Sequence, residues 1–392
     1  MSDVVIVEAA RSAVGKKRGG LSHYPSPDLF ADVLKAAVDR TGIDSALVGQ
    51  VAGGCVSQVG MQSGNVTRSA WLAAGLDHRT AAFTVHTQCG SSQQAFTLAY
   101  GLVSSGVTDV AVAGGVESMN QVPMGSSGLP ELGTPRTPRY EERYEIVTQF
   151  EAVERIAEKW GVTREDAEQF AVTSQERAAR AIAEGRFESQ IVPVETPVVD
   201  ESGVVVGTKT VAVDEGPRPT TLESLAGLRL NLPDRPGGCV HTAGTSSQIS
   251  DGASALVLTT EAKAAELGLR PRARVVDSLL VGSDPVLTLT GPIPATQALL
   301  ERTGLTLEDI DVVEVNEAFA SIVLAWAQET KADMEQVNVN GGAIALGHPL
   351  GGTGGILLTK ALNELERTGG RYGLVTMCVG GGQGTGTIIE RL

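Results

Sequence analysis

The sequence has little of what marks a secreted, membrane-bound or nucleic-acid-binding protein. It contains only four cysteines in 392 residues, at positions 55, 89, 239 and 378, and none forms a CxxC pair. Neither a disulfide framework nor a zinc site is therefore indicated. Basic residues are also scarce, with 31 Lys and Arg against 46 Asp and Glu and a formal net charge of −15. This balance argues against nonspecific binding to nucleic acid or to an anionic membrane.

Long apolar runs and aromatic residues are scarce as well. The run VVIV at residues 4–7 lies between Asp3 and Glu8 and is too short for a signal peptide or a membrane span. Together with the isolated cysteines, this predicts a cytoplasmic protein in a reducing compartment. Aromatic residues make up 4% of the chain, but apolar residues reach 42% and charged residues 20%. That composition is typical of a folded globular protein.

The sequence is long and rich in glycine. Many of its 47 glycines stand in pairs after apolar runs, which indicates tight turns where backbone approaches backbone or a ligand. A chain of this length exceeds one ordinary core, so we expect two or three domains or a duplicated unit. Two buried strands that end in glycines, VAVAGGVESM and GLVTMCVGGGQG, indicate a duplication.

Apolar strands and amphipathic helices alternate through the first 118 residues. The pattern predicts strands at 4–7, 50–54, 82–85 and 110–113, with helices at 28–38, 65–74 and about 91–106. The strand at 82–85 has the apolar character of a buried strand. The alternation predicts an α/β fold with a largely parallel sheet. Four basic residues after the first strand are interpreted as a solvated loop: Arg11, Lys16, Lys17 and Arg18.

The character of the sequence changes from Met119. Residues 121–148 are rich in Gly, Pro, Ser and charge, and the spacing of Thr163 and Asp166 predicts a capped helix over 163–185. Such a segment suits either a plain structural cap or a support for a binding surface. We expect an N-terminal α/β half at 1–118 completed by strands in 251–268, an inserted loop subdomain at 119–250, and a C-terminal α/β half at 269–392.

Cys89 lies at the joint between an apolar strand and a helix, in the segment HTQCGSSQQAF. Unpaired backbone NH groups and the positive end of the helix dipole favour a thiolate there, which would make Cys89 a nucleophile. A small buried hydrophobe is the other interpretation of a free cysteine. Three further stretches favour the nucleophile. They are VNEAFA with Asn316, NGGAIALGHPLGGTGG with His348, and TMCVGGGQG with Cys378.

Strand ends of an α/β sheet meet at one site, so we expect these residues to converge. A cysteine, a histidine and a second cysteine supply a nucleophile, its base and a further proton donor. The blocks QCGSS, NEAFA, NGGAIALGHPLGGTGG and CVGGGQGTG, in this order, resemble the signatures of the thiolases. The resemblance covers essentially the whole chain, from VIVEAARSAVGK to the last strand. It implies duplicated α/β halves in a layered αβαβα core, with an inserted loop subdomain.

The resemblance also implies a role for each site residue. Cys89 would be the acylated nucleophile and His348 the base that takes its proton. Cys378 would protonate the departing acetyl-CoA carbanion and activate the incoming CoA thiol. Asn316 would hold a water that, with His348, stabilises the enolate oxygen. The NH groups of Cys89 and Gly380 would form a second oxyanion hole.

The same resemblance predicts the binding of coenzyme A as a co-substrate, with no metal and no permanently bound cofactor. Ser247 would lie near the pantetheine, in a tunnel lined by Ala243, Ala318 and Phe319. Two arginines are candidates for phosphate contacts or, alternatively, solvated loop residues: Arg218 and Arg229. Acyl-CoA and CoA would be the partners, and the family suggests a homodimer or homotetramer.

Three residues depart from the common pattern: His86, Ser92 and Thr245. His86 is either a second proton carrier or a structural hydrogen-bonding residue. Three other histidines are interpreted as surface or loop residues: His23, His78 and His241. Cys55 and Cys239 are interpreted as inert.

The leading functional hypothesis is a 3-ketoacyl-CoA thiolase, an acetyl-CoA C-acyltransferase of fatty-acid or steroid side-chain β-oxidation, because SSQISDGA and the QC block resemble the degradative type. The alternative is a biosynthetic acetoacetyl-CoA thiolase. A ketoacyl synthase shares the fold, but Cys378 and its glycines argue against it. A non-catalytic acyl-CoA-binding protein would be expected to lack one of the three reactive residues, and none is lost.

Overall fold

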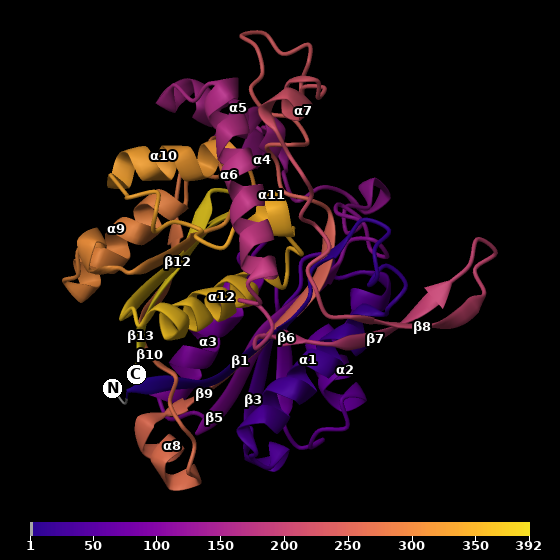
Figure 1. The fold of residues 1–392 in the computed structure, drawn as a ribbon, viewed down its shortest axis with the longest axis vertical. Coiled ribbons are helices and arrows are strands. Elements are labelled where there is room, and N and C mark those ends of the chain that lie inside the picture. The colour runs from indigo at the N-terminus through magenta and orange to yellow at the C-terminus, as the bar shows by residue number, and fades with distance from the viewer. Residues whose placement is uncertain (1–2) are drawn as a thin grey trace.

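A computed structural model describes residues 3–392 and shows a mixed α/β protein built around one long sheet (Figure 1). In the described part of the chain this sheet has 11 strands, in the order β11-β12-β13-β10-β1-β9-β5-β3-β4, with β2 paired to β9 and β6 to β1. The strands of this sheet are β1 (Val4–Ser12), β2 (Gly15–Lys16), β3 (Gln50–Gly54), β4 (Ala81–Val85), β5 (Val110–Ser118), β6 (Ile191–Val192), β9 (Ser250–Thr260), β10 (Ala273–Gly282), β11 (Val312–Val315), β12 (Tyr372–Val379) and β13 (Gln383–Arg391). A separate two-stranded sheet consists of β7 (Val194–Val199) and β8 (Val205–Val211).

Helices cover both faces of the sheet, and four of them lie with β6, β7 and β8 in the segment between β5 and β9. The helices are α1 (Ser26–Thr41), α2 (Val66–Ala73), α3 (Ser91–Ser104), α4 (Pro138–Glu141), α5 (Gln149–Trp160), α6 (Arg164–Ala183), α7 (Leu222–Ala226), α8 (Glu261–Leu267), α9 (Pro292–Thr303), α10 (Ala320–Thr330), α11 (Ala343–Leu346) and α12 (Thr353–Thr368). The capping box predicted from the sequence is confirmed, because Thr163 and Asp166 exchange the hydrogen bonds that begin α6. No helix among residues 3–392 is both long and apolar enough to cross a membrane.

The whole sheet is mixed, but the four strands predicted in the first 118 residues run in one direction, as expected, because β3 pairs parallel with β4 and β5, and β1 and β5 both pair antiparallel with β9. Parallel pairing joins β3 to β4, β3 to β5, and β11 to β12. The pairs β5–β9, β9–β1, β1–β10, β10–β13 and β13–β12 are antiparallel. A continuous apolar run indicates a strand that is buried on both faces. An antiparallel strand with helices on both sides has the same sequence pattern as a strand of a parallel sheet.

The two ends of the sheet form two halves that meet at a short seam. β1 and β10 share only the register pairs Val5↔Arg274 and Ile6↔Ala273. Between the halves lie α3 and α12, whose apolar side chains form one buried cluster with β1, β5, β9, β10 and β12. On the outer faces, α1 and α2 pack on the N-terminal half, and α9 and α10 on the C-terminal half. These five layers are the predicted αβαβα arrangement.

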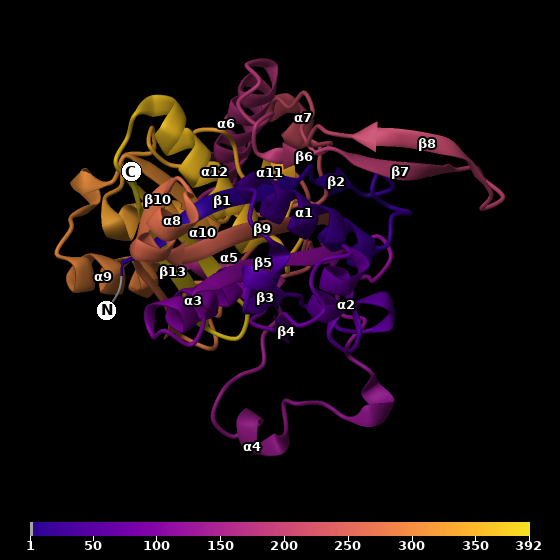
Figure 2. The ribbon, with the colours of Figure 1, turned by 90° about the horizontal axis from the view of Figure 1, so that it is seen from below.

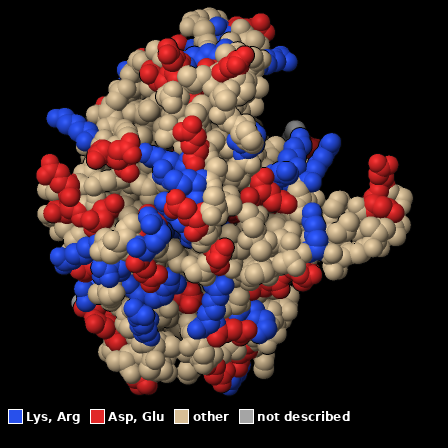
Figure 3. All heavy atoms as spheres, viewed as in Figure 1, with Lys and Arg blue, Asp and Glu red and all other residues tan. Residues whose placement is uncertain are grey.

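Residues 119–249 leave the layered core after β5 and return at β9. The hairpin of β7 and β8 projects from the body in both ribbon views, and the loop that carries α4 projects in Figure 2. The domain boundaries drawn from the sequence stay a prediction. Figure 3 shows acidic and basic side chains interspersed over the face seen in Figure 1.

Two local predictions are wrong. The strand predicted to be buried, β4, is the edge of the sheet, and its side chains are half-buried or exposed because no strand among the described residues pairs beyond it. Arg11 is not part of a solvated loop. It lies on β1, is 0% exposed, and forms a bidentate ion pair with Asp214 at 2.7 and 2.9 Å. The inserted segment supplies this partner from far along the chain, which sequence spacing does not reveal.

Candidate active site

Cys89 lies in a tight turn between β4 and α3. Gln88, just before it, has a φ of 44°, in the left-handed region that side chains other than glycine rarely adopt. The backbone NH of Gly90 donates to the carbonyl of Thr87 at 3.0 Å, and that of Ser91 donates to Gln88 at 3.1 Å. Strain of this kind persists only where surrounding contacts enforce it, and it often marks functional sites. The turn places the thiol two residues before the start of α3.

His348 lies between α11 and α12 and is 2% exposed. Its Nδ1 is 2.6 Å from Oγ1 of Thr353, whose hydroxyl donates to the carbonyl of Pro349 at 2.8 Å. Because the hydroxyl hydrogen is already used, Nδ1 must donate and Nε2 carries the lone pair. Nδ2 of Asn316 donates to Nε2 at 3.2 Å. Burial lowers the pKa of His348 to about 4, so the imidazole is neutral at pH 7 and able to accept a proton.

Both candidate thiols are protonated at rest. Burial raises the pKa of Cys89 to about 11, although the NH groups of Cys89 and Gly380 oppose that rise. Cys378 lies at the end of β12 and is 0% exposed. Burial and the neighbouring Cys89 raise the pKa of Cys378 well above its usual range. A nucleophile with such a pKa needs an adjacent base, which is the part that a neutral His348 suits.

Asn316 and Gly380 are the other two residues predicted to be catalytic. Asn316 follows β11 directly, and its Oδ1 is buried without a hydrogen-bond partner among the described residues. A buried polar atom of this kind is costly unless a ligand or water satisfies it, so it is available to one. Gly380 follows β12, and the next two NH groups, of Gly381 and Gly382, both donate to Oγ1 of Thr288. That anchor fixes the loop whose NH faces the Cys89 thiol.

The predicted pantetheine residues lie together beside this site. The NH of Ser247 donates to the carbonyl of Ala318 at 2.9 Å, so the loop that also holds Ala243 rests on the start of α10. Phe319 and Ala318 are buried in one cluster with Cys378. Two predicted phosphate contacts, Arg218 and Arg229, are exposed.

Comparisons with protein-family models match both halves of the chain. The thiolase N-terminal domain matches residues 4–262, and the thiolase C-terminal domain matches residues 269–391. The chain belongs to the thiolase family. It is therefore an acyltransferase, and the resemblance of its sequence blocks is confirmed.

Three relatives illustrate the range of thiolases that the chain is similar to. A steroid 3-ketoacyl-CoA thiolase of Mycobacterium tuberculosis is 49% identical over 100% of this chain and 95% of the relative. A beta-ketoadipyl-CoA thiolase of Acinetobacter baylyi is 41% identical over the full length of both. The crystal structure of the Bacillus anthracis acetyl-CoA acetyltransferase aligns with a TM-score of 0.90 at 36% identity, over 100% of this chain and 99% of that one. The fold is thus the thiolase fold.

One histidine of this thiolase was misplaced by sequence reasoning. His241, interpreted as a surface or loop residue, lies in a loop but is 0% exposed. Its Nδ1 is 2.9 Å from Oε1 of Glu154, and the backbone NH groups of Val240 and His241 donate to the same carboxylate. A loop can be buried when a side chain satisfies its backbone, and Glu154 does so here. His23 and His78 are exposed, as expected.

Sequence reasoning also missed three residues that support the site. Thr353 orients His348, Thr288 anchors the glycines after Cys378, and Glu117 is a buried carboxylate with a hydrogen bond to the turn that follows His348. Only Glu117 carried a visible signal, as an acidic residue that ends the apolar run VAVAGGVES. The other two are threonines, one at the first residue of α12 and one in the loop before α9, and a threonine at either place indicates no specific role.

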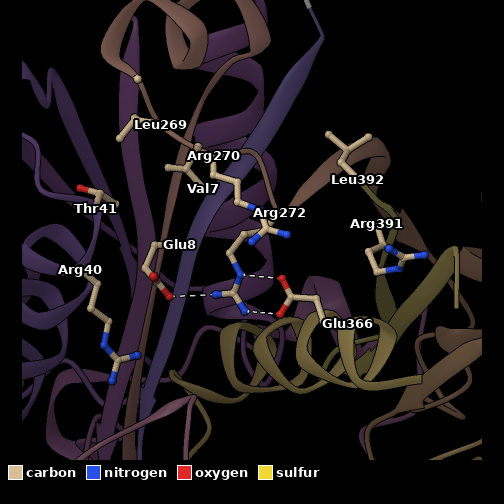
Figure 4. Close-up of a pocket in the computed structure, with 11 residues that line it drawn as sticks. Val7, Glu8, Arg40, Thr41, Leu269, Arg270, Arg272, Glu366, Arg391 and Leu392 are labelled. Atoms are coloured by element: carbon tan, nitrogen blue, oxygen red, sulfur yellow. Dashed lines mark hydrogen bonds and ion pairs between the residues drawn. The ribbon is translucent and has the colours of Figure 1, made fainter. Parts of the chain in front are cut away.

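A cavity of about 600 Å³ lies at another place in the molecule, between β1, α12 and the C-terminal residues (Figure 4). Four arginines line it, but the protein already uses three of them. Arg272 pairs with Glu8 and Glu366. Arg40 donates to backbone oxygens at 189 and 191, and Arg391 to those at 369 and 370. The cavity contains none of the candidate catalytic residues, and no cluster suited to a metal ion occurs among residues 3–392.

Proposed function

We propose that the chain is a 3-ketoacyl-CoA thiolase that works through an acyl-enzyme on Cys89. His348 takes the thiol proton, and the sulfur attacks the 3-keto carbon of the substrate. The bond between C2 and C3 then breaks, and its electron pair leaves on acetyl-CoA as an enolate. Cys378 protonates that carbanion at C2. The resulting Cys378 thiolate takes the proton of an incoming CoA thiol, whose sulfur attacks the thioester. The shortened acyl-CoA leaves, and the released Cys89 thiolate takes back the proton held by His348.

The observation that carries the proposal is the environment of the imidazole. A neutral His348, with Nδ1 held by Thr353 and Nε2 as its acceptor nitrogen, now bonded to Nδ2 of Asn316, suits a base for Cys89, whose pKa burial raises to about 11. Asn316 supports the same reading, because a water held by its amide would complete a donor pair for the enolate oxygen. The NH groups of Cys89 and Gly380 would stabilise the tetrahedral intermediate of the acyl transfer.

We further propose the degradative direction, in fatty-acid or steroid side-chain β-oxidation, with acyl-CoA and CoA as the partners in a cytoplasmic homodimer or homotetramer. Similarity to a steroid 3-ketoacyl-CoA thiolase at 49% identity supports this choice. Ser247, Ala243, Ala318 and Phe319 would line the pantetheine tunnel. The alternative is a biosynthetic acetoacetyl-CoA thiolase, which the similarity to acetyl-CoA acetyltransferases supports.

Two measurements test the proposal. Thiolysis rates on acetoacetyl-CoA and on a long-chain or steroid-tail 3-ketoacyl-CoA separate the two directions, and a strong preference for the four-carbon substrate would favour the biosynthetic alternative. Intact mass after mixing with acetyl-CoA tests the acyl-enzyme itself. We expect an acetyl adduct on Cys89, and an unmodified mass would favour a non-catalytic acyl-CoA-binding protein.

A further inference from the structure

Glu117, near the end of β5, is a buried carboxylate to which the catalytic scheme gives no role. It is 0% exposed. Its Oε2 accepts hydrogen bonds from the backbone NH groups of Val56 and Gly351, both at 2.9 Å. Its Oε1 accepts from the NH of Ser57 at 3.0 Å and from Nε2 of Gln62 at 2.8 Å. All four partners donate, which suits a carboxylate in its ionised form.

These donors come from two separate loops, each of which reaches the candidate active site. Val56 follows β3, and its side chain packs in one cluster with Leu350 and Cys89. Gly351 lies in the turn that joins His348 to α12, three residues after the imidazole. One carboxylate thus joins a loop beside the nucleophile to the turn that carries the base.

The backbone around this carboxylate is packed so closely that only glycine fits. A Cβ on Gly351 would lie 2.8 Å from both Oε2 of Glu117 and Cα of Cys55, and would also collide with the carbonyl oxygen of Val116. A Cβ on Gly54 would lie 2.8 Å from the carbonyl oxygen of Gly351. Because close-packed interiors transmit strain, a small shift at the carboxylate would move both loops.

We propose that Glu117 is a positioning residue, which ties the turn after His348 to the loop after β3 and thereby sets the imidazole against the Cys89 thiol. The inference rests on the proposed function, since it presupposes that His348 takes a proton from Cys89. The negative charge has a second effect, because it adds to the larger contribution of burial in raising the pKa of Cys89. Removing the charge should make the Cys89 thiol easier to ionise. Removing the hydrogen bonds should instead displace the base that takes its proton.

The variant Glu117→Gln separates these effects. Glutamine keeps the shape, but its NH₂ group would face two of the donors that the carboxylate now accepts from. We expect kcat for thiolysis to fall about 10²-fold through misplacement of the base, with little change in the KM for CoA. We also expect the pH midpoint of Cys89 alkylation by iodoacetamide to move downwards. A merely structural residue would lower the folded fraction without moving that midpoint.

The matched control is Asp214→Asn. Asp214 is likewise buried and accepts from a backbone NH, that of Val14, and from Arg11, and it makes no hydrogen bond to the loop after β3 or to the turn after His348. This variant should lose stability but keep the alkylation midpoint and the kcat of its folded fraction. If Glu117→Gln does not fold, Gln62→Leu replaces it. That variant removes one donor to the carboxylate and the acceptor of the Ser118 NH, but it retains the charge, so we expect a smaller fall in kcat and no lowering of the midpoint.

The outcomes distinguish this inference from the function on which it rests. Wild-type kcat in Glu117→Gln, or in Gln62→Leu if only that variant folds, would overturn the positioning role. So would a Glu117→Gln variant that behaves like Asp214→Asn in both readouts. A wild-type enzyme without thiolysis and without an acetyl adduct on Cys89 would instead overturn the proposed function. A fall in kcat together with a lowered midpoint in Glu117→Gln supports the inference.

Discussion

At the scale of single residues, the site depends on groups that burial holds in their neutral forms. Cys89 and Cys378 are thiols and His348 is a neutral imidazole, because desolvation opposes every charge at the site. Proton transfers between them therefore start from uncharged partners. The reaction creates charge only when substrate is present, next to the NH groups that can stabilise it.

Replacement of Cys89 by serine tests the nucleophile. A hydroxyl is a much weaker nucleophile than a thiol beside the same base, so we expect Cys89→Ser to lower thiolysis by roughly 10³-fold or more. Intact mass should show no acetyl adduct after exposure to acetyl-CoA. Cys239→Ser, at a thiol that donates to Glu154, serves as the control, and this variant should still form the acetyl adduct on Cys89. An adduct retained by Cys89→Ser would place the acyl group elsewhere.

The lowered pKa of His348 predicts a pH-dependent stability. The folded imidazole has a pKa of about 4 and the unfolded one about 6.5, so between these values the unfolded chain binds more protons. Stability from this group is fully present above pH 6.5 and is lost as the pH falls towards 4, by about 3 kcal/mol. Urea unfolding from pH 7 to pH 4.5 should show a steeper loss for the wild type than for His348→Gln. Parallel curves would contradict the assignment.

At the scale of elements, α3 and α12 cross so closely that one helix needs a glycine. A Cβ on Gly354, in the first turn of α12, would lie 2.5 Å from the backbone nitrogen of Gln93 on α3. Cys89 lies two residues before the start of α3, and Thr353 is the first residue of α12. The approach of the two helices therefore fixes the distance between the elements that hold nucleophile and base.

We therefore expect Gly354→Ala to destabilise the protein by about 1–3 kcal/mol, through the backbone shift that overpacking forces. Thiolysis should fall with it. Gly101→Ala is the matched control, because it lies on α3 with nothing within 4 Å of the added Cβ. Alanine there should stabilise the helix by about 0.5–1 kcal/mol. Thermal unfolding of both variants measures the difference, and equal effects would exclude the crossing as the cause.

The elements also show which parts of the fold local sequence could predict. The capping box of α6 and the strand ends at Cys378 and Asn316 depend on neighbours in the chain, and local spacing revealed them. Strand direction, the edge position of β4, and the burial of Arg11 depend on partners far along the chain. The site residues were found through a resemblance in motifs, whereas Thr353 and Glu117 act through tertiary hydrogen bonds. No periodicity encodes such contacts.

At the scale of the whole molecule, the two halves share one interior. The buried cluster between the two halves takes residues from α12 in the C-terminal half and from β1, β5 and β9 in the N-terminal half. Each half alone would expose an apolar face that the other now covers. The seam between β1 and β10, with two register pairs, adds little to this shared burial.

A chain that ends at residue 268 should therefore not fold by itself. It would retain β1 to α8 but lose α12, whose buried leucines cover one face of its sheet. We expect a soluble fraction without a cooperative thermal transition by circular dichroism, or an insoluble product. A cooperative transition in this fragment would show that the N-terminal half is an independent folding unit.

The β7–β8 hairpin stands apart from this shared interior. Its tip, at residues 200–204, is exposed and far along a two-stranded ribbon that reaches away from the catalytic loops (Figure 1). Exposed loop tips tolerate insertions because few buried contacts depend on them. An epitope or a fluorescent domain inserted there would thus allow the enzyme to be immobilised or imaged while both halves of the long sheet stay intact.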